Sequence, residues 1–291
     1  MKHAILGAGG IGGLIGASLA HSGESVTMVI RSEALGKHPD QLHLESPFGK
    51  FDVAAAVAAE VPAVDVLWIA VKATQLEEAL ASVRNGSQVR AIIPLLNGID
   101  HVSRLRSRYG ADRVIPATIS VESERVSPGH IVHRSPFAKL NVASSGRKLL
   151  QGTLDQLQKI GFTCQFVDDE QTLMWSKLVF LAPLALATSA AGKTIGEIRA
   201  ESNLQQQLES CVREACSVAI AEGAKVDAEG VIATIRGLPG PMRSSMQKDV
   251  EQGRPPELDA IGGPILRAAS RHRLEVPITR KLVEAVERKS R

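Results

Sequence analysis

Short apolar runs alternate with polar stretches through the first 168 residues of the chain. The runs lie at residues 4–6, 26–30, 65–71, 91–96 and 114–121 and are rich in Ile, Val and Leu. Runs of this kind are typical of strands buried on both faces of a parallel sheet. We therefore predict an α/β fold with a central parallel sheet. Pro94 is awkward for a central strand because it cannot donate a ladder hydrogen bond.

Weaker signals add shorter elements to this half. Residues 11–19 repeat apolar side chains at helical spacing, and Gly23 closes that segment. The other predictions are a hairpin at residues 47–50, a second hairpin of strands 130–133 and 139–143 that turns at Ser135-Pro136, a helix at 148–160 and a strand at 162–167.

From residue 169 onward, helical spacing replaces the strand signals. Asp168 and Asp169 form an N-cap region, and prolines punctuate the following segments. We predict an N-terminal α/β domain of residues 1–168 and an all-helical C-terminal domain of residues 169–291, with a cleft between them. The predicted helices span residues 170–191, 202–222, 227–235, 242–251, 257–272 and 278–288.

Composition and charge narrow the function classes. The chain has 34 basic and 31 acidic residues, a net charge of +3 and no basic stripe, so we expect no nucleic-acid partner. The cysteines, Cys164, Cys211 and Cys216, are odd in number and lack C-x-x-C spacing. This argues against a disulfide framework or a metal site and fits a reducing cytoplasm.

Two apolar stretches are superficially similar to an export signal or a membrane-spanning segment. Lys2 followed by small and apolar residues to Ala20 resembles a signal peptide, but the glycine spacing and the following strand explain these residues better. Residues 178–191 are too few to span a bilayer and contain Pro183. We therefore expect neither export nor a membrane partner, and interpret residues 178–191 as a buried helix.

The glycines after the first apolar run form the clearest local motif. Gly7, Gly9 and Gly12 follow G-x-G-x-x-G between a predicted strand and a predicted helix. There Gly7 permits a sharp turn, Gly9 lets the backbone approach a pyrophosphate, and Gly12 lets helix and strand pack closely. The N–H groups at the helix start would face the phosphates. We predict a dinucleotide site, although the motif alone also occurs in ordinary turns.

The end of the second predicted strand discriminates between dinucleotides. NAD enzymes of this fold usually carry Asp or Glu there for the ribose 2′-hydroxyl. This chain has Arg31 followed by Ser32, and a guanidinium suits a phosphate. We therefore predict NADPH over NADH. A solvated arginine is the alternative, and Glu33 and Lys37 complicate the signal.

Four further polar residues could carry chemistry. Lys177 lies in a segment apolar nearly all round, so its ammonium either reaches an edge or is desolvated, which lowers a lysine pKa toward a useful range. Glu257 begins a helix, where a carboxylate also serves the helix dipole. Lys72 and Asn97 follow predicted strands at the sheet edge where ligands bind, although such residues are often only turn formers.

Five segments occur in the order found in one family. They are GAGGIGG at the start, VKATQ with Lys72, LLNG with Asn97, WSKLVF with Lys177, and SSMQKDVEQGRPPELDAIGG with Glu257, and the phrase HRLEVP follows. Over nearly its whole length the chain resembles the ketopantoate reductase (2-dehydropantoate 2-reductase) family. The SSMQKDVEQGR…EL segment is far more specific than the glycine motif.

The resemblance implies a Rossmann domain followed by a helical domain, with the active site between them. It also implies hydride transfer from NADPH to the carbonyl carbon of a 2-oxo acid. A homodimer is one assembly open to such an enzyme, but the sequence does not reveal the oligomeric state. The cofactor-binding residues it implies are Gly7, Gly9 and Gly12 at the pyrophosphate, Arg31 at the 2′-phosphate, and Lys72 and Asn97 near the nicotinamide.

The resemblance also assigns the chemistry to the C-terminal half. Lys177 would be the general acid that protonates the substrate oxygen, and Glu257 would orient the substrate hydroxyl and Lys177. Ser244 or Ser245, otherwise plain polar helix residues, would bond the substrate carboxylate, and alignment through SSM favours Ser244. Asn97 would contact substrate as well as cofactor.

Two positions depart from the family pattern. After the lysine, members commonly carry asparagines in a pattern like K-L-x-x-N-x-x-x-N-P, where this chain has Leu181 and Ala185. A pocket that loses polar partners should bind a polar substrate less well. Three hypotheses therefore stand: a ketopantoate reductase of pantothenate biosynthesis, a paralogue that reduces a more apolar ketone, 2-oxo acid or imine, and a non-catalytic dinucleotide-binding protein. The third predicts loss of Lys177 or Glu257, and both are present.

Overall fold

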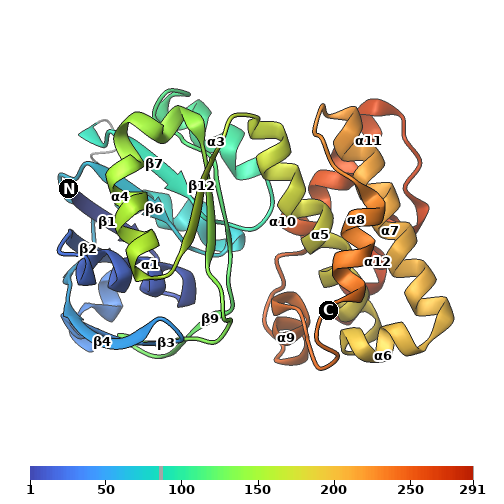
Figure 1. The fold of residues 1–291 in the computed structure, drawn as a ribbon, viewed down its shortest axis with the longest axis horizontal. Helices are drawn as coiled ribbons and strands as arrows, with labels where there is room; N and C mark the ends of the chain where they lie inside the picture. Colours follow the sequence, from blue (N-terminus) through green and yellow to red (C-terminus); the bar gives the residue numbers. More distant parts are fainter. Residues whose placement is uncertain (85–87, 291) are drawn as a thin grey trace. The chain divides into compact units, whose positions relative to one another are not determined.

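The computed structural model describes residues 1–84 and 88–290 (Figure 1), and the chain forms two compact units. Unit 1 comprises Met1–Leu96 and His101–Leu173. Unit 2 comprises Asn97–Asp100 and Met174–Arg291, so a short segment from the first half of the sequence belongs with the helical part. The predicted domain boundary at residue 168 stays a prediction.

A five-stranded parallel sheet forms the centre of unit 1, which confirms the predicted fold class. Its order is β5-β2-β1-β6-β7, with every neighbouring pair parallel. Pro94 lies in the edge strand β7, where one side of the strand needs no partner. The strands are β1 (Lys2–Leu6), β2 (Ser25–Val29), β5 (Ala56–Ala58), β6 (Val66–Ile69) and β7 (Ala91–Pro94).

The two faces of this sheet bury alternate side chains, as a pleated strand requires. Ala4 and Leu6 of β1 belong to an apolar cluster on one face. Ile5 and Met28 point the other way, toward Gly16 of helix α1 (Gly10–His21). The helix also packs against a second sheet, so it lies between two layers of unit 1.

The second sheet has the order β4-β3-β10-β9, and a third has the order β12-β11-β8. The predicted hairpin at residues 47–50 is confirmed, since β3 and β4 pair antiparallel across it. The strands of these sheets are β3 (Gln41–Ser46), β4 (Gly49–Ala54), β9 (Ser123–Ser127), β10 (His130–His133), β8 (Ala117–Ser120), β11 (Lys139–Ala143) and β12 (Thr163–Val167).

Two strand predictions are wrong. The runs 130–133 and 139–143 do not form a hairpin, because β10 pairs with β3 and β9 whereas β11 pairs with β8 and β12. Residues 114–121 are not a third central parallel strand, because β8 pairs antiparallel with β11 and only an isolated bridge from Val114 reaches Ile92 of β7. Neither register leaves a signal in the local pattern of apolar residues.

Helices and short 3₁₀ turns connect the strands of unit 1. Asp169 accepts a hydrogen bond from the backbone N–H of Thr172, which confirms the predicted N-cap before the first long C-terminal helix. The connecting elements are η1 (Ser32–Lys37), η2 (Ala73–Gln75), α2 (Leu76–Ala79), η3 (Leu80–Ser82), α3 (Asp100–Tyr109), η5 (Ser144–Gly146) and α4 (Arg147–Ile160).

The C-terminal part is helical, as predicted, around one continuous apolar core. The predicted helix 257–272 is two helices, since Pro264 has no N–H to donate to the carbonyl of Ala260. Helix α6 was not predicted; Thr194 and Glu197 start it with a capping box. The helices are α5 (Glu170–Ala191), α6 (Ile195–Ala200), α7 (Ser202–Ala221), α8 (Ala228–Arg236), α9 (Ser245–Glu251), α10 (Leu258–Ile261), α11 (Gly263–His272) and α12 (Pro277–Lys289).

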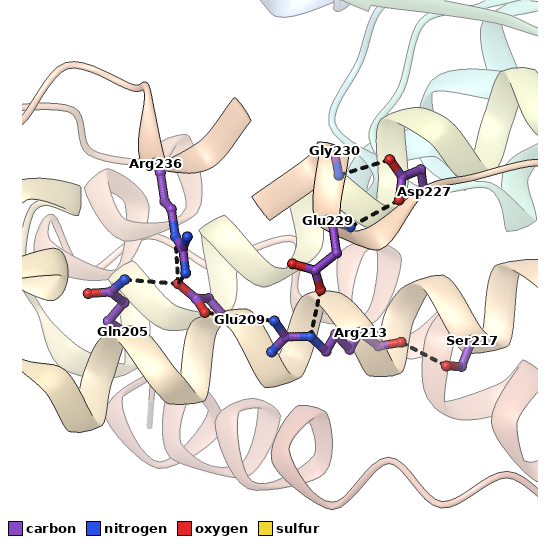
Figure 2. Close-up of polar contacts among 8 residues, drawn as sticks. All are labelled: Gln205, Glu209, Arg213, Ser217, Asp227, Glu229, Gly230 and Arg236. Carbon is purple, nitrogen blue, oxygen red and sulfur yellow. Dashed lines mark hydrogen bonds and ion pairs between the residues drawn. The ribbon is translucent and has the colours of Figure 1, made fainter. Parts of the chain in front are cut away.

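Side-chain pairs on α7 fix helix α8 against it (Figure 2). Glu209 accepts hydrogen bonds from Arg236 at 2.6 and 2.9 Å, and Arg213 donates to Glu229 at 2.9 Å. Asp227 caps the start of α8 through the N–H groups of residues 229 and 230. Because these groups are mostly exposed, they set the helix register more than they add stability.

Helix α5 is the one helix among the described residues that is long and apolar enough, by length and composition, to cross a membrane. In the protein, 72% of its most apolar 18-residue window is buried, as in the core helix of a folded domain. This agrees with the buried helix predicted there, and Pro183 lies inside it. The helix matters most for the position of Lys177.

Candidate functional site

The glycine turn of unit 1 assigns a separate task to each predicted glycine. Gly7 has φ +106°, and its N–H donates to the carbonyl of Val29 at 3.1 Å. A Cβ on Gly12 would lie 1.9 Å from the carbonyl oxygen of Gly7, whereas a Cβ on Gly9 would meet nothing within 4 Å. Gly7 therefore provides conformation, Gly12 provides close packing, and Gly9 leaves open space above the turn.

Helix α1 begins directly after this open space. Its N-cap is Gly9, and no side chain caps its first N–H groups. Uncapped N–H groups and the positive end of the helix dipole suit a phosphate group. The turn therefore has the chemistry of a pyrophosphate site.

Gly10 is a fourth glycine that this turn requires, and it was not predicted. A Cβ on Gly10 would lie 2.2 Å from the carbonyl oxygen of Ser123. The Ser123 hydroxyl donates back to the carbonyl of Gly10 at 3.0 Å. The doubled glycine in GAGG was a signal for such a contact, but nothing in the sequence identifies Ser123 as the partner.

The predicted phosphate-binding arginine lies just beyond the end of β2. The Arg31 side chain is 55% exposed, and its Nε lies 3.6 Å from a carboxylate oxygen of Glu78. No acidic residue occupies residues 30–32, where an NAD enzyme would carry one. The guanidinium is thus accessible to a ligand, with Glu78 as a competing partner.

Lys72 belongs to the same unit as the glycine turn. It follows β6, and the residue before it packs against the turn, since a Cβ on Gly7 would lie 2.8 Å from Cγ1 of Val71. The Lys72 carbonyl accepts a hydrogen bond from the N–H of Gln75, which starts the short η2 turn. Sheet order and turn therefore bring the Lys72 backbone near the glycine motif.

Unit 2 holds a separate cluster of three predicted residues. Lys177 Nζ donates to Asn97 Oδ1 at 3.2 Å, and Asn97 Nδ2 donates to Glu257 Oε2 at 3.0 Å. Lys177 comes from α5, Asn97 from the 97–100 segment, and Glu257 from the residue that precedes α10. The Asn97 side chain thus joins the cation to the carboxylate.

Backbone contacts explain how Asn97 reaches this cluster. Gly98 has φ +83°, and a Cβ there would lie 2.1 Å from the carbonyl oxygen of Ala260. Asp100 accepts from Arg267 Nε at 3.0 Å and so fixes the other end of the segment to α11. Only glycine permits both the conformation and the close approach.

Burial sets the electrostatics of the cluster. Desolvation lowers the pKa of Lys177 to about 8, against the opposing influence of the Glu257 carboxylate. Glu257 is itself only 8% exposed. A partly buried ammonium with a pKa near neutrality, hydrogen-bonded to an amide, can give up a proton and can stabilise negative charge on a neighbouring oxygen.

The two serines differ in what their hydroxyls already do. Ser244 caps α9, since its Oγ accepts from the N–H of Gln247 at 3.0 Å. That Oγ also lies 2.8 Å from the hydroxyl of Thr188, which itself donates to the carbonyl of Leu184 at 2.8 Å. The Ser244 proton therefore goes to Thr188. Ser245 is exposed at the first position of α9.

The two departures from the family pattern lie on α5. Ala185 is fully buried in the apolar core of unit 2, and Leu181 is partly buried against it. Both side chains extend the apolar surface that surrounds the Lys177 helix. They offer no hydrogen bond to a ligand.

The structure therefore brings together two sets of predicted residues, each within its own unit. Gly7, Gly9, Gly12 and Lys72 lie near one another in unit 1, and Asn97, Lys177 and Glu257 form a bonded set in unit 2. Their roles toward a ligand stay predictions.

Comparison with protein families matches the chain twice. The model described as "Ketopantoate reductase PanE/ApbA" matches residues 3–145, and the model described as "Ketopantoate reductase PanE/ApbA C terminal" matches residues 169–290. Together they cover the glycine turn, Asn97, Lys177 and Glu257.

Individual relatives agree with this. The chain is 28% identical to the uncharacterized oxidoreductase YkpB of Bacillus subtilis, with 96% of this chain and 95% of YkpB covered. It is 29% identical to a 2-dehydropantoate 2-reductase of Caulobacter vibrioides, with 96% of each covered. The solved structure of D-mandelate dehydrogenase with NADH and anilino(oxo)acetate has a TM-score of 0.87 at 22% identity, covering 100% of this chain and 98% of that one. At that identity the likeness shows the fold.

Proposed function

Because the chain belongs to the ketopantoate reductase family, we propose that it reduces a 2-oxo acid to a 2-hydroxy acid with NADPH. The family makes it an oxidoreductase with a nicotinamide dinucleotide cofactor. The leading substrate is 2-dehydropantoate, which would place the enzyme in pantothenate biosynthesis. The observation that carries the proposal is the hydrogen-bonded set of Lys177, Asn97 and Glu257.

The cofactor fits the residues of unit 1. The open space above Gly9 and the uncapped start of α1 suit a pyrophosphate, and the exposed guanidinium of Arg31 suits a 2′-phosphate. Lys72 and Asn97 would contact the nicotinamide side. When bound, the reduced nicotinamide supplies the hydride that the carbonyl carbon accepts.

Lys177 would supply the proton in this reaction. Hydride addition turns the carbonyl oxygen into an alkoxide, and the ammonium both stabilises that charge and donates a proton to it. Desolvation supports this role, because a pKa of about 8 allows proton transfer near neutral pH. Glu257, through Asn97, would hold the ammonium in place and orient the new hydroxyl.

The substrate carboxylate would be bound by Ser244 or Ser245. The contacts around α9 distinguish the two hydroxyls: Ser244 donates to Thr188, whereas Ser245 is exposed. Ser244 stays the assignment that the family motif implies, and its hydroxyl would have to leave Thr188 to reach a carboxylate. Asn97, which already accepts a hydrogen bond from Lys177, would also form a hydrogen bond with the substrate.

A second candidate substrate class follows from Leu181 and Ala185. These apolar residues favour a 2-oxo acid with a larger apolar group over the hydroxyl-bearing ketopantoate. The solved neighbour bound to anilino(oxo)acetate supports this alternative, because its fold accommodates an aryl group beside an oxoacetate. Its NADH also makes cofactor preference a question for measurement.

The remaining expectations follow from the family. We propose a cytoplasmic enzyme with a small-molecule substrate. A homodimer is the expected assembly, in line with a ketopantoate reductase of Staphylococcus aureus whose structure is described as dimeric.

The test is oxidation of NADPH, followed by its absorbance, with ketopantoate and a panel of apolar 2-oxo acids such as 2-oxoisovalerate and phenylglyoxylate. NADH is run in parallel, and Lys177→Ala is the inactive control. Efficient turnover of ketopantoate supports the pantothenate role. Preference for the aryl substrate supports the second candidate. Tight NADPH binding without turnover of any 2-oxo acid contradicts the proposed reaction.

A further inference from the structure

The second sheet of unit 1 gathers three side chains that the sequence analysis did not connect. His43 and Glu45 lie two residues apart on β3 and so point to the same face of the sheet. Strand β10 runs parallel to β3 with His130 opposite His43. Three metal-ligating side chains therefore share one patch of the sheet, although Glu45 and His130 are 85 residues apart in the chain.

The distances within this patch are close to those of a coordination sphere. Glu45 Oε1 lies 2.9 Å from His130 Nε2 and 3.7 Å from His43 Nε2, and the three ligand atoms all lie within 4.8 Å of one another. Ligands at about 2.0–2.1 Å from a tetrahedral Zn²⁺ are roughly 3.3–3.4 Å apart. Small side-chain rotations would bring all three atoms onto one ion.

Two neighbouring residues of β4 complete the arrangement. Asp52 Oδ1 accepts a hydrogen bond from His43 Nδ1 at 2.8 Å, which leaves the Nε2 lone pair of His43 directed at the patch. Lys50 Nζ donates to Glu45 Oε2 at 2.8 Å, so Oε1 is the carboxylate oxygen that faces both histidines. A carboxylate behind a ligating histidine is the usual outer partner of a metal site.

We propose that His43, Glu45 and His130 bind a divalent transition-metal ion, with Zn²⁺ as the preferred ion and water in the remaining position. Two imidazoles and one carboxylate suit zinc and its neighbours, whereas Ca²⁺ and Mg²⁺ prefer oxygen ligands alone. The ion would link β3 to β10, across the sheet that covers helix α1. Cysteine spacing gives no sign of such a site, because its ligands are brought together by strand pairing.

Polar contacts on the exposed sheet are the competing explanation for the same residues. In that case the histidines, Glu45, Asp52 and Lys50 would only pair with one another across the strands. The two explanations differ in their response to Zn²⁺, because a cross-strand ion pair gains nothing from the ion. They also differ at Lys50, whose removal takes away a cation beside the proposed dication and should strengthen metal binding.

The test is isothermal titration calorimetry of ZnCl₂ into the full chain, stripped of metal with a chelator and freed of any histidine tag. We expect saturable binding of one ion in the micromolar range. His43→Asn and His130→Asn should each weaken it at least tenfold, and Asp52→Asn about tenfold. His272→Asn is the matched control, since this exposed histidine pairs with Glu222 in unit 2 and should leave binding unchanged.

A second measurement keeps the proposal testable if one histidine variant folds poorly. Zn²⁺ should raise the thermal midpoint of the wild type and of Lys50→Gln, but not that of Glu45→Gln. Co²⁺ should show the visible absorption of a tetrahedral site in the wild type and in Lys50→Gln, but not in Glu45→Gln. Absence of saturable Zn²⁺ binding, or equal binding by the His43→Asn/His130→Asn double variant, would overturn the proposal.

Discussion

The glycine turn of unit 1 is a site formed by backbone groups, whereas the lysine cluster of unit 2 is formed by side chains. The turn is made of backbone within the first residues of the chain: Gly7 supplies an unusual φ and Gly12 a close contact. The cluster is made of side chains that are 80 and 160 residues apart in sequence. The conformation of a backbone site is part of the local fold, so the strand and helix depend on it. The side chains of the cluster can be replaced while the helices that carry them remain folded.

This difference predicts how the two sites respond to substitution. A change at Gly7 or Gly12 disturbs strand and helix packing together with ligand binding, whereas Gly9 has open space around it. A change in the cluster leaves the apolar core of unit 2 intact, because Lys177 and Asn97 are only partly buried at its margin. The following substitutions test that contrast.

The largest effect is expected from Lys177→Ala. Loss of a positioned proton donor costs about 10²–10⁴-fold in turnover, while the glycine turn proposed to bind NADPH is untouched. Steady-state kinetics and a fluorescence titration of NADPH measure the two properties. Lys193→Ala is the matched control, since Lys193 is an exposed lysine paired with Glu201 in the same unit. Turnover near the wild-type rate in Lys177→Ala would remove the general-acid role.

Two alanine substitutions in the turn should separate packing from ligand binding. In Gly12→Ala the new Cβ meets the carbonyl of Gly7 at 1.9 Å, so the free energy of unfolding should fall by about 1–3 kcal/mol and NADPH binding should fall with it. In Gly9→Ala the Cβ meets no protein atom within 4 Å, so stability should stay near that of the wild type while NADPH affinity drops. Chemical denaturation and NADPH titration measure both. Equal NADPH affinity in Gly9→Ala and wild type would contradict the placement of the pyrophosphate.

The pH dependence of the reaction should report the lowered pKa of Lys177. Because the proton donor must be charged, kcat/KM for reduction should decline as pH rises through about 8. The folded-state pKa lies below the ordinary lysine value of 10.5, so the unfolded chain binds more protons between these two pH values. The contribution of Lys177 to stability therefore rises with pH across that window.

Lys177→Met is the control for both measurements. It should abolish the decline in rate together with most of the rate itself, and it should flatten the change in unfolding free energy between pH 8 and 10.5. A wild-type profile that stays level well above pH 8 would mean that another group donates the proton.

The features that could be predicted from the sequence are those determined by residues close together in the chain. The bounds of α5 follow from helical spacing and from the Asp169 cap, and the glycine turn follows from its motif. The pairing of β8 and β10 could not be predicted, because a strand's apolar pattern does not name its partner. The contact of Gly10 with Ser123 could not be predicted either, because it depends on which strand lies beside the turn.

The candidate chemistry divides in the same way. The apolar residues around Lys177 predict an ammonium that either reaches an edge or is desolvated. Only the fold shows that Asn97 stands between it and Glu257. The family resemblance grouped these three residues into one site, which their spacing in the sequence could not do, because each lies in a segment that matches the family. The histidine patch on β3 and β10 has no such motif, so only the strand register reveals it.

The smallest effect is expected from Arg31→Glu, because the Arg31 side chain is 55% exposed and solvent screens its charge. A carboxylate there repels the 2′-phosphate and can accept a bond from a ribose hydroxyl, so the preference for NADPH over NADH should fall about tenfold or less. The ratio of kcat/KM for the two cofactors measures it, at low and at high salt. Lys37→Glu, on the neighbouring η1 turn, is the matched control and should change the ratio less. If Arg31→Glu retains the wild-type ratio and Lys37→Glu loses it, the phosphate is recognised by η1 and not by the end of β2.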